Sequence, residues 1–207
     1  MKDVNDTGIN NKIKLLLVLG TIIIAVLSLT LSYAIFSFDG NGTLLNSITT
    51  ATVSMTYTEG ENKISIENAL PLEDEIGKKL TNDNQVFDFT VDIKVTGKQT
   101  IAYEVTGEKD SESTLDDNAV RLYLEKSEDK ENYKAVQEPS YYVPLLEDDT
   151  FGAKKGEMIL DTGTVTESKV YYYRLRMWVS KDYKVNDVSN FFTIKVNVYG
   201  KDSNTGE

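Results

Sequence analysis

A long uncharged and mostly apolar run near the N-terminus constrains the fold of this chain more than any other feature. Residues 15–38 contain no charged side chain, and most of them are leucine, isoleucine, valine, alanine or phenylalanine. As a helix, a run of this length would span a hydrocarbon core of roughly 30 Å. Buried helices of soluble proteins rarely lack a polar face over such a length. We therefore expect residues 15–38 to enter or cross a membrane.

The charges on either side of this run predict its orientation. Lys12 and Lys14 precede it, and Asp39 follows it. Because basic residues favour the cytoplasmic side of a membrane, we expect residues 1–14 to form a cytoplasmic n-region. The rest of the chain then lies outside the cell, either released or on the outer face of the cell membrane.

The same run can be a cleaved signal peptide or a permanent transmembrane helix. Ser32-Tyr33-Ala34 has the small-x-small pattern of a signal peptidase site, and cleavage after Ala34 would leave a chain that begins at Ile35. The apolar stretch before that point is longer than the usual core of a signal peptide, so an uncleaved anchor is the alternative to the cleavage that this site favours. Both alternatives stay open at this point.

The composition removes most catalytic and metal-binding chemistry. The 207 residues include no cysteine and no histidine. Thiolate metal sites, the usual zinc ligands and nucleophile pairs that depend on histidine are therefore excluded. We predict no enzyme, no cofactor and no bound metal. The net charge of −11 also argues against a nucleic-acid partner, because phosphate binding requires a basic surface.

After the apolar run the hydrophobic pattern has a period of two, which is typical of strands with one buried face. The clearest strand covers residues 87–95. Other strands are predicted at residues 53–57, 64–66, 101–105, 120–124, 171–179 and 192–198. Together they predict a mainly β domain over residues 39–200, an antiparallel β-sandwich of jelly-roll or Ig-like type after one N-terminal hydrophobic helix. Residues 201–207 are expected to form a disordered tail.

Three segments around these strands carry their own predictions. Residues 96–99 have the composition of a turn, so the strands on either side are expected to form a β-hairpin. Residues 70–80, with proline near the start and three acids in the first turn, are expected to form a short helix. The polar and acidic stretch 107–117 is expected to be a mobile loop.

Two arginines on one predicted strand suggest an interaction surface. Arg174 and Arg176 alternate with apolar residues, which places them with Tyr172 and Trp178 on the face opposite the core. Guanidinium groups pair with carboxylates and stack on aromatic rings, so these four residues could form an interface patch. The alternative is an ordinary cross-strand ladder to acids such as Asp88 on a solvated face.

Acidic clusters occur at residues 73–75, 116–117 and 147–149. Such carboxylates can bind calcium, but none of the clusters has the loop spacing of an EF-hand. Solvated turns are the simpler interpretation.

The order of these features resembles the TasA and camelysin family of Gram-positive bacteria. The resemblance rests on the lysines before the apolar run, Leu19-Gly20 within it, Ala34-Ile35-Phe36-Ser37 at the expected cleavage point, and the acidic sandwich. The family's aromatic-Phe-Ser-Asp motif is matched in part, because Ile35 replaces the aromatic residue and Phe38 precedes Asp39. The resemblance implies a secreted protein that polymerises into extracellular fibres or joins a biofilm matrix. The metalloprotease label of some camelysin-like members does not fit a chain without histidine.

Two functions remain from the sequence. The first is a self-assembling fibre subunit, a homopolymer in which one chain lends a strand to the edge of the next. Its donor residues would be Ile35, Phe36, Phe38, Val53 and Met55. The second is an adhesin or ligand-binding module that is anchored in the membrane through residues 15–38 and meets other surface molecules through its loops.

Overall fold

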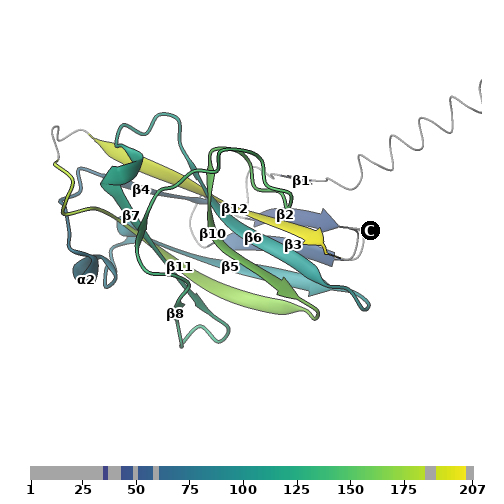
Figure 1. Cartoon of the computed structure of the whole chain (residues 1–207). Coiled ribbons are helices and arrows are strands. Elements are labelled where there is room, and N and C mark those ends of the chain that lie inside the picture. The colour runs from purple at the N-terminus through teal and green to yellow at the C-terminus, as the bar shows by residue number, and fades with distance from the viewer. Residues whose placement is uncertain (1–34, 37–42, 49–50, 58–60, 185–189, 204–207) are drawn as a thin grey trace, which may run out of the picture. The chain divides into compact units, whose positions relative to one another are not determined.

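The computed structural model describes residues 35–36, 43–48, 51–57, 61–184 and 190–203 (Figure 1). The segment 1–34, which carries most of the predicted signal peptide or anchor, lies outside the described residues. Among the residues that are described, none belongs to a helix with the length and apolar character needed to cross a membrane.

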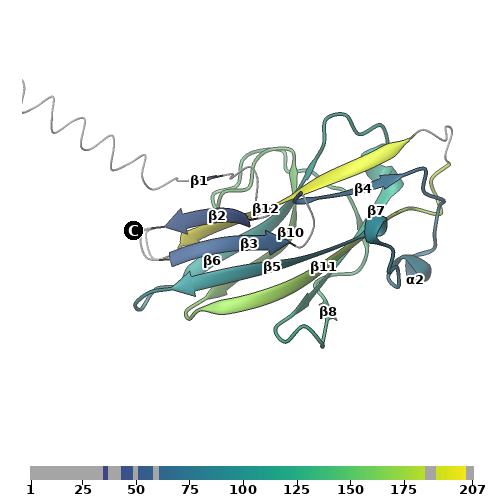
Figure 2. The same cartoon turned by 180° about the vertical axis from the view of Figure 1, so that it is seen from behind.

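Strands dominate the unit that begins at Ile35, and they form two sheets (Figures 1 and 2). The larger sheet contains, in spatial order, β1 (Ile35–Phe36), β2 (Thr43–Ile48), β3 (Ala51–Tyr57), β5 (Val86–Val95), β11 (Lys169–Val179), β7 (Val120–Ser127) and β8 (Lys134–Ala135), with β9 (Ser140–Tyr141) also paired to β7. The smaller sheet contains β10 (Glu157–Val165), β6 (Ile101–Lys109), β12 (Phe191–Asp202) and β4 (Lys63–Glu67). All ladders between these strands are antiparallel. The prediction of a mainly β domain with two antiparallel sheets is confirmed.

The chain changes sheet at each step from β3 to β7, and the same alternation resumes from β10 to β12. The predicted hairpin over residues 87–105 is therefore wrong. β5 pairs with β3 and β11, whereas β6 pairs with β10 and β12. The turn at residues 96–99 is an arch, because both strands bury their apolar side chains between the sheets instead of sharing a ladder.

One hydrophobic core fills the space between the two sheets. Val91 and Ile93 of β5 are fully buried, as their alternation with polar residues predicts. Aromatic rings extend this core, and the rings of Phe89 and Tyr173 stack with their centroids 5.0 Å apart. The strand faces expected from the period-two pattern are the faces that pack together.

The predicted helix over residues 70–80 is reduced to a single turn, α2 (Asp74–Gly77). Gly77 lies against the indole of Trp178, and a Cβ atom at this position would come within 2.2 Å of that ring. Beyond the turn, the Leu80 carbonyl accepts a hydrogen bond of 2.8 Å from Arg176 Nε. These tertiary contacts end the helix earlier than its sequence pattern indicates. Two further short turns are 3₁₀ helices, η2 (Asp83–Gln85) and η3 (Asp117–Ala119).

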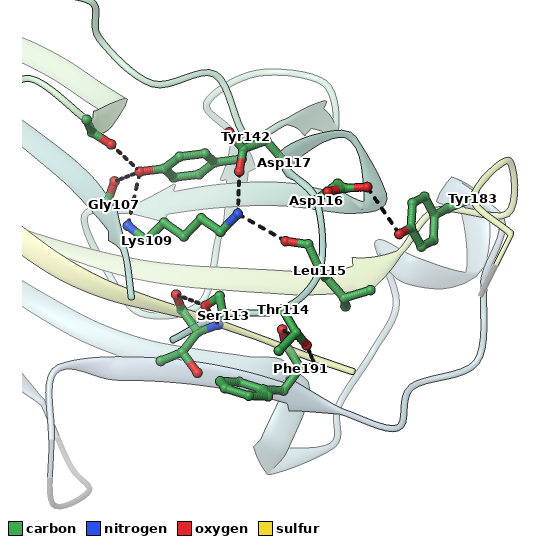
Figure 3. Close-up of polar contacts among 12 residues, drawn as sticks. Gly107, Lys109, Ser113, Thr114, Leu115, Asp116, Asp117, Tyr142, Tyr183 and Phe191 are labelled. Carbon is green, nitrogen blue, oxygen red and sulfur yellow. Dashed lines mark hydrogen bonds and ion pairs between the residues drawn. The ribbon is translucent and has the colours of Figure 1, made fainter. Parts of the chain in front are cut away.

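The segment expected to be a mobile loop, residues 107–117, is anchored (Figure 3). Its first residues belong to β6, and Leu115 is buried with 3% exposure. The backbone N–H groups of Thr114 and Leu115 donate to the Phe191 carbonyl at 3.0 and 3.1 Å. Lys109 Nζ donates to the Leu115 carbonyl and to Asp117 Oδ1 at 3.0 and 2.6 Å. The apolar Leu115 was the signal in the sequence for this anchoring.

The C-terminal strand is longer than predicted. Lys201 and Asp202, which we expected in a disordered tail, are the last residues of β12. Ser203 continues the contact by donating its backbone N–H to the Thr100 carbonyl at 2.9 Å. Residues 204–207 of the expected tail lie outside the described residues.

Candidate ligand-binding groove

A groove of about 440 Å³ lies over β3, β5 and β11, next to the turn between β7 and β8. We call it the tyrosine groove, and the residues that define it are Thr56, Asp88, Thr90, Lys130, Tyr133, Tyr172 and Arg174.

Two rows of paired residues cross the sheet beneath this groove. In the first row, Thr90 lies opposite Thr56 on one side and Tyr172 on the other. In the second row, Arg174 lies opposite Asp88 and, on its other side, Glu125. Because directly opposed residues of antiparallel strands have neighbouring side chains, the rows place hydroxyl groups beside an ion pair.

The ion pair has a bidentate geometry. Arg174 donates from Nε and one terminal nitrogen to the two carboxylate oxygens of Asp88, at 2.8 and 2.7 Å. The guanidinium carbon also lies 4.7 Å from the centroid of the Tyr133 ring. The hydrogen bonds that Arg174 donates to Asp88 raise the pKa of Arg174. Its planar group is thus fixed on two sides, by a carboxylate and by an aromatic face.

A tight turn holds the rim of the groove. Asp129 accepts hydrogen bonds from the backbone N–H groups of Glu131 and Asn132 at 2.9 and 2.8 Å, and from the Asn132 side chain at 2.6 Å. These bonds, from Asn132 first, hold the pKa of Asp129 well below its ordinary value. The adjacent Lys130 has a φ of +67°, and its Nζ lies 4.7 Å from the Tyr172 ring centroid. The turn therefore presents a cation over an aromatic ring at the groove edge.

The structure brings together two of the four residues of the predicted patch. Tyr172 and Arg174 line the tyrosine groove, and the Arg174 pair with Asp88 is the ladder contact that we considered as the alternative. Arg176 is only 7% exposed and forms an ion pair with Glu125. Trp178 is fully buried against α2, so it does not share a surface with the others.

Sequence reasoning missed Tyr133 and Lys130, because the stretch that follows β7 gave no regular pattern. The spacing of Ser127, Asp129 and Asn132 is typical of an Asx turn and could have indicated a fixed turn here. No local signal indicates that this turn leans over the sheet.

The predicted donor-strand residues divide into three groups. Ile35 and Phe36 form strand β1, which pairs antiparallel with β2 of the same chain, Ile35 opposite Asn46. Val53 and Met55 belong to β3 and are fully buried in the core of their own chain. Phe38, like the predicted cleavage residues Ser32 and Ala34, lies outside the described residues.

The acidic clusters are engaged in local contacts. Arg121 donates two hydrogen bonds to Asp74, at 3.1 and 2.7 Å, and Lys109 pairs with Asp117. Asp148 accepts the Lys155 N–H at 3.0 Å. Within the described ranges, no group of three or more acidic residues is arranged to hold a metal ion.

Comparisons with known proteins give only distant likenesses. No protein-family model and no curated protein matches the sequence. Among solved structures, CBM32-3 from a family 31 glycoside hydrolase of Clostridium perfringens is 12% identical, with a TM-score of 0.29 over 68% of this chain and 92% of that chain. CpGH89CBM32-5 of Clostridium perfringens, in complex with GalNAc-β-1,3-galactose, is 10% identical, with a TM-score of 0.26 over 73% of this chain and 94% of that chain.

A third solved structure is AvmM, which catalyses macrocyclization in alchivemycin A biosynthesis. It is 8% identical, with a TM-score of 0.29 over 70% of this chain and 95% of that chain. TM-scores this low support neither a fold assignment nor a function.

Proposed function

We propose that this protein is a surface-displayed β-sandwich module that binds a saccharide in the tyrosine groove. The observation that carries the proposal is the bidentate Asp88–Arg174 pair, which lies beside the rings of Tyr133 and Tyr172 in an open groove. Binding sites commonly combine aromatic surface with a few placed polar groups.

Each part of the groove matches a part of a sugar ring. The faces of the Tyr133 and Tyr172 rings that Arg174 and Lys130 do not cover would supply an apolar surface for the C–H face of the sugar ring. Asp88 accepts hydrogen bonds from hydroxyl groups and Arg174 donates them, so the pair can engage two neighbouring hydroxyls at once. Thr90, in the first row, adds a hydroxyl that both donates and accepts. The open form of the groove suits a segment of a longer glycan.

Display outside the cell is part of this proposal, and it rests on the apolar run 15–38 with its lysine flank. A binding module that stays attached through this run would hold its ligand at the cell surface. Cleavage after Ala34 would instead release the module with its ligand.

Pull-down with insoluble polysaccharides tests this function. Tyr172→Ala should weaken binding at least about tenfold, since truncation of an aromatic residue that anchors a ligand costs about 2 kcal/mol or more. Val170→Ala is the matched control, because Val170 is an exposed residue two positions earlier on the same strand. Equal binding by both variants and the wild type would refute the groove as the site.

A second candidate function is the fibre subunit implied by the family resemblance. The pairing of Ile35–Phe36 with β2 favours it, because a two-residue edge strand can be exchanged with the same strand of another copy. Electron microscopy of the chain that starts at Ile35, compared with the chain that lacks residues 35–38, tests this function. Filaments from the first and none from the second would support strand exchange, and equal filament formation would exclude it.

A further inference from the structure

Strand β4 (Lys63–Glu67) is an edge of the smaller sheet (Figure 2). In the part of the chain that the structure describes, it forms a ladder with β12 alone. An edge strand presents backbone N–H and C=O groups that can pair with another strand.

The sequence of β4, Lys-Ile-Ser-Ile-Glu, is self-complementary in charge. If two copies of β4 pair antiparallel with Ser65 opposite Ser65, each Lys63 lies opposite the Glu67 of the other copy. Ile64 of each copy then lies opposite the other Ile66. Lys63 and Glu67 are exposed while the isoleucines are buried, so the opposite charges meet on the outer face and the apolar residues meet on the core face. Opposite charges on directly facing residues stabilise antiparallel pairs.

The other edge of the same sheet lacks this property. The charged residues of β10 are Glu157 and Asp161, and both are acidic. No antiparallel register of two β10 strands can therefore pair opposite charges. For a chain with a net charge of −11, an edge that offers balanced charges is the one that a second copy can approach.

A groove of about 610 Å³, lined by both polar and apolar residues, lies beside the β4 edge. Ser65, Ile66 and Glu67 form one wall. Leu70 and Ile76 also line the groove, and they are 79% and 54% exposed. Exposed apolar surface next to an open strand edge is typical of an interaction site. A second copy paired on β4 would cover this surface.

We propose that two copies of the chain pair their β4 strands antiparallel about a two-fold axis through Ser65, so that the smaller sheet continues from one copy into the other. This isologous contact closes after two copies and does not propagate into a filament. It is independent of the tyrosine groove, which lies on the larger sheet, and it would give each assembly two such grooves. Two linked sites on one glycan bind more tightly than one site alone.

Disulfide trapping tests this pairing, because the chain contains no cysteine. Facing residues of antiparallel strands have Cα atoms about 4.5–5.5 Å apart, within the range of about 4.4–6.8 Å that a disulfide bridges. The full-length chain with Ser65→Cys should therefore form a covalent dimer under mild oxidation, seen on a non-reducing gel. Thr164→Cys is the control, since Thr164 is an exposed residue of β10, the opposite edge of the sheet.

Charge reversal makes the test specific for the register. Adding Lys63→Glu to Ser65→Cys places two glutamates opposite each other and should reduce the dimer to the level of the Thr164→Cys control. Adding Glu67→Lys as well restores opposite charges and should restore the dimer. The proposal is overturned if Ser65→Cys gives no more dimer than the control, if Lys63→Glu has no effect, or if the double reversal fails to restore the dimer.

Ser65 Oγ lies 2.7 Å from Thr193 Oγ1, so the cysteine variant could disturb the strand itself. Sedimentation velocity in detergent of the full-length chain with its native Ser65 gives an independent measurement. The wild type and the Lys63→Glu, Glu67→Lys double variant should sediment as dimers, and Lys63→Glu as a monomer. A wild type that stays monomeric at high concentration contradicts the proposal.

Discussion

The carboxyl group of Glu104 should make the stability of this domain fall as the pH rises towards neutrality. Glu104 is only 4% exposed and lies on β6. Its carboxyl accepts a weak hydrogen bond, of 3.4 Å, from the Ala153 N–H. Burial first, and then the neighbouring Asp149 carboxylate, raise the pKa of Glu104 to about 7. Glu157, which is also buried, adds a smaller repulsion.

The sign of the effect follows from the direction of this shift. In the unfolded chain Glu104 titrates near its ordinary pKa of 4.5, and in the folded chain near 7. Between these values the folded state binds more protons than the unfolded state, so stability is fully present below about pH 4.5 and declines as the pH rises through 7. The difference in pKa corresponds to at most about 3 kcal/mol.

Glu104→Gln tests this reasoning because glutamine keeps the size of the side chain and removes the charge. The variant should match the wild type near pH 4 and exceed its free energy of unfolding by up to about 3 kcal/mol at pH 8. Urea unfolding of the chain from Ile35, followed by the fluorescence of the single tryptophan, Trp178, measures it. Glu108→Gln, at an exposed position on the same strand, is the control. Equal pH dependence of Glu104→Gln and the wild type would refute the argument.

Three further variants test the packing described above. Gly77→Ala should destabilise the domain by about 1–3 kcal/mol, because the new methyl group collides with the indole of Trp178. The fluorescence emission of Trp178 should also shift to longer wavelength. An unchanged emission would contradict the contact. Tyr142→Phe should lower the free energy of unfolding by about 1–3 kcal/mol, since its hydroxyl lies 2.5 Å from the Gly156 carbonyl in a buried position. Leu115→Ala should lower it by about 2–5 kcal/mol and speed amide exchange in residues 110–117, whereas a freely moving loop would show neither change.

The strands of this domain could be predicted from sequence because side-chain alternation is a local property. The pattern of Phe87 to Val95 marks both the strand and its buried face, and the structure agrees. Pairing is not local. The turn at residues 96–99 is compatible with a hairpin or with an arch. The arch forms because both edges of β5 pair with β3 and β11, and both edges of β6 pair with β10 and β12.

The residues of the tyrosine groove could likewise be predicted only in part from the sequence. Tyr172 and Arg174 were predictable as a pair on one face, because they alternate with apolar residues of β11. Tyr133 and Lys130 belong to a turn whose position depends on the ladder between β7 and β8. No periodic pattern in the sequence indicates that position. Trp178 has the spacing of an outward residue, yet α2 covers it. Alternation indicates opposite faces of a strand but not which of them another element will cover.

Nuclear magnetic resonance can show whether a saccharide occupies the tyrosine groove. A soluble oligosaccharide from a polysaccharide that the protein retains is titrated into the chain from Ile35, and the shifts of its amide and tyrosine ring signals are followed. We expect the largest changes at Thr90, Tyr133, Tyr172 and Arg174. Shifts confined to other parts of the domain, or saturable binding that leaves these four residues unchanged, would contradict it.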